Sequence, residues 1–290
     1  YCIVRADLST SSENKLKNKF KYYFGNDLNY LFGTRIFVLN GNITEQNFGL
    51  LDEQYEFLGK NVSEVINCAA LVKHFGDYKV FERINVTGVK NVISFAEKYN
   101  RRFIQISTTS VAGTEINLPF TSKNPFLRIP YNEKRLFAHQ KLDNVYVRSK
   151  FEAEKFMLER LANKKLRGII LRVGNITNRI VDGKFQENIS ENAYINRLLG
   201  FIKIGAIPES LKGIYLEFTP IDITANSIIS LITHPNENNR IFHLFNNNHV
   251  YLNTISKYLK NILITSLSLY WILPVVRDVW QIYFLTEVMI

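Results

Sequence analysis

Residues 145–155 read VYVRSKFEAEK and place a phenol and an ammonium four positions apart, at Tyr146 and Lys150. The stretch has the pattern of a long helix, and helix positions i and i+4 share a face, so both side chains can point into one cleft. A lysine beside a tyrosine favours the phenolate, so we expect a phenol pKa below its usual value of about 10. Such a tyrosine exchanges a proton with a carbonyl or alcohol oxygen near neutral pH. Two unrelated exposed residues are the alternative.

Short apolar segments alternate with helical segments on both sides of this stretch. The predicted strands are residues 2–5, 35–40, 65–70, 102–107 and 168–172, and the predicted helices are 12–24, 80–99 and 146–163. This alternation predicts an α/β protein with a doubly wound, Rossmann-like parallel sheet. Ligands of such sheets bind in a crevice beyond the carboxyl ends of the strands, and the functional residues lie there. The residues that fall at these ends are Arg5, Asn42, Ala69, Thr108 and Gly174.

The regularity weakens after Asn178. We expect a helix at 193–203, a helix that ends near 232, and a strand at 240–244. Residues 262–276 are apolar and uncharged, but Pro274 interrupts them. They are shorter than the roughly 20 residues that cross a membrane, so a buried helix pair or the edge of a longer domain is predicted instead.

Composition narrows the class of partner. The 290-residue chain has a net charge of +10, which favours an anionic partner or reflects drift toward Lys and Asn. The charge is spread out and no recognition module is present, which argues against nucleic acid. Cys2 and Cys68 offer no disulfide framework, so a cytoplasmic location is expected. Neither the two cysteines nor the five histidines have ligand-like spacing, so no metal site is predicted.

Several short motifs occur in a fixed order along the chain. They are NCAA (67–70), NVTG (85–88), STTSVAG (107–113), YVRSK (146–150) and TPID (219–222). Together they resemble the extended short-chain dehydrogenase/reductase superfamily. Four further segments are similar in sequence to the thioester reductase branch: YCIVR (1–5), LDNVY (142–146), KFEAE (150–154) and LRVGNIT (171–177). That branch comprises the terminal reductase domains of nonribosomal peptide synthetases and carboxylic acid reductases.

The resemblance implies a catalytic trio of Thr108, Tyr146 and Lys150. Composition alone leaves Ser107, Thr109 and Ser110 as competitors for the hydroxyl, and alignment with the family selects Thr108. In this family the tyrosine supplies a proton, and the lysine tunes the tyrosine and binds the nicotinamide ribose.

The resemblance also implies a set of NADPH-binding residues. Arg5 stands where the family places a cation for the 2′-phosphate, a role that suits the guanidinium fork. Asn42 stands where relatives often carry Asp against the adenine. Ala69 and Ala70 let the backbone approach the cofactor, or they simply pack tightly. Asn85 resembles a buried asparagine that holds the active-site strands, with a solvent-facing residue as the alternative.

Two further residues complete this set, Gly174 and Asn175, which fall where the family closes over the nicotinamide. One departure is that the family opens with a strand and a glycine-rich turn for the pyrophosphate, and this chain shows none. The sheet is therefore expected to lack its central strand, and the chain is either a fragment or has lost that part. The expected domains are a truncated NADP-binding domain at 1–177 and a lid at 178–290, with 219–245 packing back on the sheet.

The function implied by the resemblance is NADPH-dependent reductive release of a carrier-bound acyl or peptidyl thioester. The product is an aldehyde, or an alcohol after a second hydride. The partner would be an acyl- or peptidyl-carrier protein with a phosphopantetheine arm, within a larger multidomain chain. The rivals are a sugar-nucleotide epimerase or dehydratase, a fatty acyl-CoA reductase, and a cofactor-less, non-catalytic remnant.

Overall fold

The computed structural model describes residues 1–113, 131–204, 211, 215–234, 239–248, 250–252 and 254. The chain divides into two compact units. The first comprises Tyr1–Leu171 with Pro235–Phe242, and the second comprises Arg172–His234 with His243–Ile290. The predicted apolar segment 262–276 lies outside the described residues.

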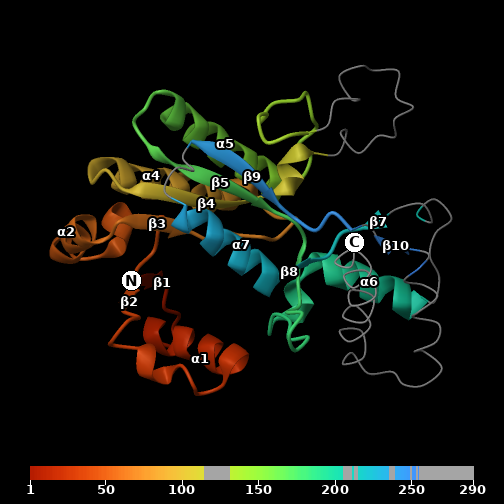
Figure 1. The fold of residues 1–290 in the computed structure, drawn as a ribbon, viewed down its shortest axis with the longest axis horizontal. Coiled ribbons are helices and arrows are strands. Elements are labelled where there is room, and N and C mark those ends of the chain that lie inside the picture. The colour runs from red at the N-terminus through yellow and green to blue at the C-terminus, as the bar shows by residue number, and fades with distance from the viewer. Residues whose placement is uncertain are drawn as a thin grey trace. The chain divides into compact units, whose positions relative to one another are not determined.

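The described elements follow the predicted alternation of strands and helices (Figure 1). The strands are β1 (Cys2–Val4), β2 (Val38–Asn40), β3 (Glu64–Asn67), β4 (Arg102–Thr108), β5 (Arg167–Val173), β6 (Ile176–Thr177), β7 (Tyr215–Leu216), β8 (Thr219–Pro220), β9 (Arg240–Leu244) and β10 (Val250–Tyr251). The α-helices are α1 (Ser12–Phe24), α2 (Asp52–Asn61), α3 (Tyr78–Phe81), α4 (Gly88–Lys98), α5 (Val145–Ala162), α6 (Ala193–Ile204) and α7 (Ile221–Thr233). Short 3₁₀ helices lie at Asn29–Leu31, Gln46–Gly49, Thr109–Ala112 and Ile189–Glu191, and a π-helix at Glu82–Thr87.

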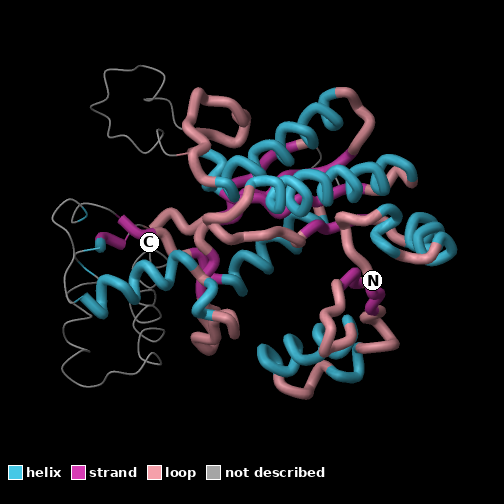
Figure 2. Tube along the Cα trace, turned by 180° about the vertical axis from the view of Figure 1, so that it is seen from behind, coloured by secondary structure: helices cyan, strands magenta, loops and turns pink. Residues whose placement is uncertain are grey.

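The larger sheet of the first unit has the strand order β3–β4–β5–β9, and β3 runs parallel to β4. Helices α4 and α5 lie side by side against this sheet (Figure 1, Figure 2). The apolar sides of strands and helices meet in one core, where burial of apolar area supplies the main folding energy. Its buried members include Val92, Ile93, Phe103, Met157 and Ile170. The protein is therefore an α/β fold with a parallel sheet.

Strands β1 and β2 form a separate parallel pair, in which Ile3 lies opposite Leu39. Helix α1 packs on this pair, and both strands contribute partly buried side chains to the core of the first unit. The sequence predicts a sheet without its central strand, and the described strands of this unit lie in two sheets rather than one.

The predicted helix at 80–99 is interrupted, because Glu82–Thr87 forms a π-helix between α3 and α4. A π-helical turn is wider than an α-helical one and is often found at functional sites. Asn85 lies in this turn and is fully buried.

The second unit contains α6 and α7 and two small sheets. Strand β6 runs parallel to β8, and β10 runs antiparallel to β7. Its core is a smaller apolar cluster that includes Phe185, Ile195, Leu198, Phe218 and Leu252. Within the described residues, no helix is both long enough and apolar enough to cross a membrane.

Candidate active site

The end of strand β4 and the first turn of α5 bring Thr108 and Tyr146 together. Six of the seven residues of strand β4 are buried, so its carboxyl end has a fixed position. Thr108 is its last residue, and its hydroxyl lies close enough to the phenol of Tyr146 to lower the phenol pKa. The Thr108 Oγ1 also accepts the N–H of Ser110 at 3.1 Å. Two hydroxyl groups from distant segments therefore meet at the carboxyl edge of the sheet.

The pKa of Tyr146 moves opposite to the direction that the sequence predicts. Burial raises it to about 12, and the nearby Thr108 hydroxyl offsets part of that rise. No effect of Lys150 on the phenol is resolved. The prediction of a lowered phenol pKa was wrong because desolvation disfavours the phenolate more than the neighbouring groups favour it. The phenol of Tyr146 is thus protonated at neutral pH.

Lys150 is buried, with 3% of its surface exposed, and its Nζ donates to the backbone carbonyl of Ile106 at 2.7 Å. Burial lowers its pKa to about 8, while the negative charge of Glu154 and the thiol of Cys68 act in the opposite direction. The ammonium therefore lies beneath the end of β4, one helical turn from Tyr146.

The N-terminus of α5 is fixed by Asn144. Its Oδ1 accepts the backbone N–H groups of Tyr146 at 2.9 Å and Val147 at 3.2 Å. Such a cap satisfies donors that the first turn otherwise leaves unpaired. The ring of His74 lies 5.6 Å from that of Tyr146, between centroids. The spacing of the histidines does not predict this neighbour, because only the fold brings the loop after β3 beside the helix.

Asn85 joins that loop to α5. Its Oδ1 accepts the N–H of Leu71 at 2.7 Å, and its Nδ2 donates to the Leu71 carbonyl and to Ser149 Oγ, both at 2.9 Å. The residue is buried rather than solvent-facing, and these contacts are to protein groups. Its amide therefore holds the loop after β3 against the helix that carries Tyr146 and Lys150.

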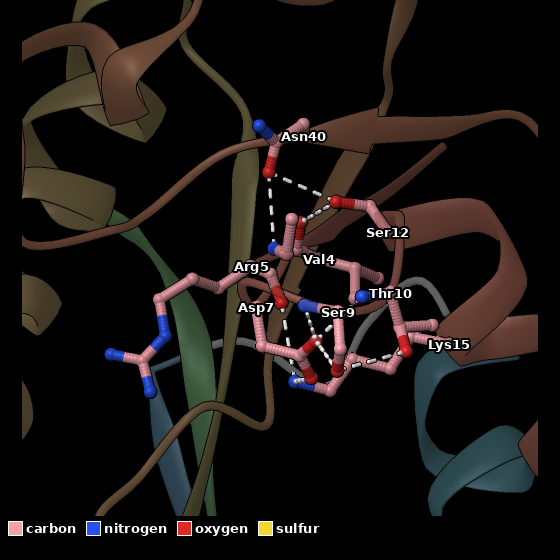
Figure 3. Close-up of polar contacts among 9 residues, drawn as sticks. Val4, Arg5, Asp7, Ser9, Thr10, Ser12, Lys15 and Asn40 are labelled. Atoms are coloured by element: carbon pink, nitrogen blue, oxygen red, sulfur yellow. Dashed lines mark hydrogen bonds and ion pairs between the residues drawn. The ribbon is translucent and has the colours of Figure 1, made fainter.

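The loop after β1 is organised by Asp7 (Figure 3). Its Oδ1 accepts the N–H groups of Ser9 at 3.2 Å and Thr10 at 2.8 Å. The other carboxylate oxygen, Oδ2, forms an ion pair with Lys15 at 3.6 Å. Figure 3 shows the exposed Arg5 side chain extending away from this cluster. No hydrogen bond or ion pair joins the Arg5 guanidinium to another described residue. Arg5 thus presents a cation to solvent at the end of β1, as a phosphate-binding residue would.

Asn42 is engaged locally. Its Oδ1 accepts from Thr44, and its Nδ2 donates to Glu45 at 3.0 Å. An adenine contact by this side chain therefore requires replacement of these bonds, and it stays a prediction. Ala69 and Ala70 follow β3, where the N–H of Ala69 donates to Asn67 Oδ1 at 3.2 Å. Strand β3 runs parallel to β4, so both alanines lie at the carboxyl edge of the sheet, where Thr108 ends β4.

Gly174 and Asn175 lie in the second unit, against Glu217. The N–H of Asn175 donates to Glu217 Oε2 at 2.6 Å. A Cβ at position 174 would lie 2.6 Å from Glu217 Oε1, so only glycine fits without a shift. Burial raises the pKa of Glu217, and the bond from Asn175 opposes that rise. The close approach of Glu217 explains why position 174 is a glycine. The role of Gly174 and Asn175 over the nicotinamide stays a prediction.

These residues suit a nicotinamide dinucleotide on chemical grounds, since Arg5 is an uncommitted cation and Tyr146 has Lys150 one turn away. The sequence pattern of the NAD-binding family described as male sterility protein matches residues 1–228. The chain belongs to that family. It is a member of the extended short-chain dehydrogenase/reductase superfamily, as the motifs predict. The described residues contain no group of three or more His, Cys, Asp or Glu that could hold a metal ion.

Two curated members with similar sequences are reductases. The chain is 26% identical over 217 residues to L-2-aminoadipate reductase of Saccharomyces cerevisiae, covering 73% of this chain and 15% of that protein. It is 26% identical over 213 residues to glycine betaine reductase of Emericella nidulans, covering 72% and 16%. The chain therefore corresponds to a small part of each of these proteins.

Solved structures of similar fold include terminal reductase domains. The thiolation-reductase di-domain of an archaeal non-ribosomal peptide synthetase gives a TM-score of 0.77 at 33% identity, covering 90% of this chain and 53% of that one. The terminal R domain from the myxalamid PKS-NRPS pathway gives 0.74 at 24% identity, covering 90% and 63%. The second likeness supports the fold alone.

Proposed function

We propose that this chain is the catalytic part of an NADPH-dependent thioester reductase that releases an acyl or peptidyl group from a carrier protein as an aldehyde. The closeness of the Thr108 hydroxyl to the Tyr146 phenol, with buried Lys150 one turn further along α5, is the observation that carries the proposal. The likeness to a thiolation-reductase di-domain supports a carrier-bound substrate and a larger multidomain chain.

The chain's own residues would stabilise the oxygen of the reacting thioester. NADPH, when bound, supplies the hydride that the carbonyl carbon accepts. The hydroxyl groups of Thr108 and Tyr146 donate hydrogen bonds to the oxygen as it becomes negative, which is the largest contribution in many acyl-transfer sites. Tyr146 then passes its proton to that oxygen. The phenolate left behind is stabilised by the Lys150 ammonium, and the hemithioacetal collapses to an aldehyde and a free thiol.

The raised pKa of Tyr146 suits this role. A phenol with a pKa of about 12 is fully protonated at neutral pH, so it begins each turnover as a donor. Arg5 would bind the 2′-phosphate, and Lys150 the nicotinamide ribose. Ala69, Ala70, Gly174 and Asn175 would contact the cofactor through their backbones or short side chains. Asn85 would act through the loop that it holds.

The test is a reaction with an acylated carrier protein and NADPH, read by absorbance at the nicotinamide band and by trapping the aldehyde. Replacing Tyr146→Phe removes the proton donor and keeps the ring, so we expect a loss of about 10²- to 10⁴-fold in turnover. Equal turnover of the variant would overturn the proposed mechanism. Turnover of a nucleotide sugar with no release of aldehyde would instead support an epimerase or dehydratase.

A further inference from the structure

The side chain of Glu154 has no role in the mechanism above, although it is fully buried in the first unit. It lies on α5 about two turns after Tyr146 and has an exposed fraction of 0%. The hydroxyl of Ser107 donates to its Oε1. Burial of an acidic group is costly unless it is paired and hydrogen-bonded.

Three consecutive residues of β4 each engage one residue of α5. The Ile106 carbonyl accepts from Lys150 at 2.7 Å, Ser107 donates to Glu154, and the Thr108 hydroxyl acts on the Tyr146 phenol. The helix partners are spaced four apart and therefore occupy one face. The strand end is thus tied to the helix by a row of three contacts, and the Glu154 contact lies between the other two along β4.

The charge around Lys150 comes from few groups. Glu154 lies four positions further along the same helix, on the same face, and both Glu154 and the Cys68 thiol after β3 raise the pKa of the ammonium. From β4 it receives the Ile106 carbonyl, and Tyr146 on its own helix is neutral. Glu154 is therefore the main acidic group that opposes the desolvation of the ammonium.

We propose that Glu154 is a positioning residue that ties α5 to the end of β4 through Ser107 and places a buried negative charge one helical turn from the Lys150 ammonium. Its side chain touches neither Thr108 nor Tyr146 in the contacts described, so it would act through Lys150. The consequence for catalysis rests on the proposed function, because only that mechanism needs the ammonium beside the phenolate. The charge relationship itself does not depend on any substrate.

The decisive measurement is the pH titration of Lys150 by NMR, with ¹³Cε- and ¹⁵Nζ-labelled lysine in the chain. The Lys150 signal is identified by its disappearance in Lys150→Arg. In Glu154→Gln, which keeps the shape and the oxygen that Ser107 contacts, we expect the Lys150 pKa to fall by about one unit or more. Glu159→Gln is the matched control, since Glu159 is exposed on the same helix, and it should leave the titration unchanged.

A Lys150 titration that is identical in wild type and Glu154→Gln would overturn the proposal. If Glu154→Gln does not fold, Glu154→Asp retracts the charge by one methylene and should give a smaller downward shift. An unchanged titration in that variant would equally refute the idea. In a chain that reduces thioesters, the alkaline limb of turnover should move by the same amount as the titration. A chain without that activity would refute the proposed function while the titration still decides the role of Glu154.

Discussion

The Nδ2 of Asn144 lies 3.0 Å from Nδ1 of His74, although the two residues are 70 positions apart. The Oδ1 of Asn144 already accepts from Tyr146 and Val147, so Nδ2 must be the donor toward the histidine. Nδ1 of His74 is then an acceptor, and the ring carries its proton on Nε2. One asparagine thereby caps α5 and joins the loop after β3 to it.

Replacing Asn144→Ala should destabilise the fold by about 1 kcal/mol, because the first turn of α5 loses its cap. Urea denaturation followed by circular dichroism measures the change. Asn144→Asp is the matched control, since aspartate keeps the capping oxygen and loses only the donor to His74. We expect Asp to remain within about 0.5 kcal/mol of wild type. Equal losses in the two variants would mean that the cap is unimportant.

Replacing Asn85→Ala should cost about 1 to 3 kcal/mol in the free energy of unfolding, because it strips partners from the buried N–H and carbonyl of Leu71. The same substitution at exposed Asn18, in α1, should change stability by no more than about 0.5 kcal/mol. Denaturant midpoints compare the two variants. A cost for Asn85→Ala as small as that for Asn18→Ala would contradict the hydrogen-bond network described for the π-helical turn.

Turnover should fall as the pH rises through about 8, the value to which burial lowers the pKa of Lys150. Below that pH the ammonium is present and can stabilise the phenolate, and above it the amine is neutral. Tyr146 titrates near 12 and cannot account for this limb. The measurement is kcat against pH from 6 to 10. In Lys150→Arg the guanidinium stays charged over this range, so the kcat of the variant should not fall as the pH rises through about 8. A decline that persists would assign the limb to another group.

Replacing Arg5→Ala should weaken NADPH binding by about 10- to 100-fold, the loss expected for a charge-assisted hydrogen bond to a phosphate. The affinity for NADH, which lacks that phosphate, should change little. Fluorescence titration with both cofactors separates the two effects. Arg35→Ala serves as a control, because Arg35 is also exposed and carries the same charge. An equal effect on NADH, or from Arg35→Ala, would contradict the assignment.

Local patterns in the sequence were enough to predict the α/β class, the family and the positions of several elements. The helix Ser12–Phe24 and the strand Arg240–Leu244 have the predicted bounds, since period-3.6 and apolar patterns are local properties. The same reasoning missed helix α2, in which only Tyr55, Leu58 and Gly59 are buried, so its apolar side is too sparse to be seen. The π-helical turn around Asn85 was not predicted either, because the Asn85 amide contacts Leu71 and Ser149, which are distant in the sequence.

The electrostatics of the candidate site depend on packing between segments that are distant in the sequence. The i, i+4 spacing predicts that Tyr146 and Lys150 share a face, but it carries no information on how deeply each is buried. The burial of the two side chains determines their pKa values, because desolvation raises the pKa of the Tyr146 phenol and lowers that of the Lys150 ammonium. The contacts of His74 with Asn144 and of Ser107 with Glu154 join residues far apart in the chain. Such contacts exist only after packing has brought the segments together.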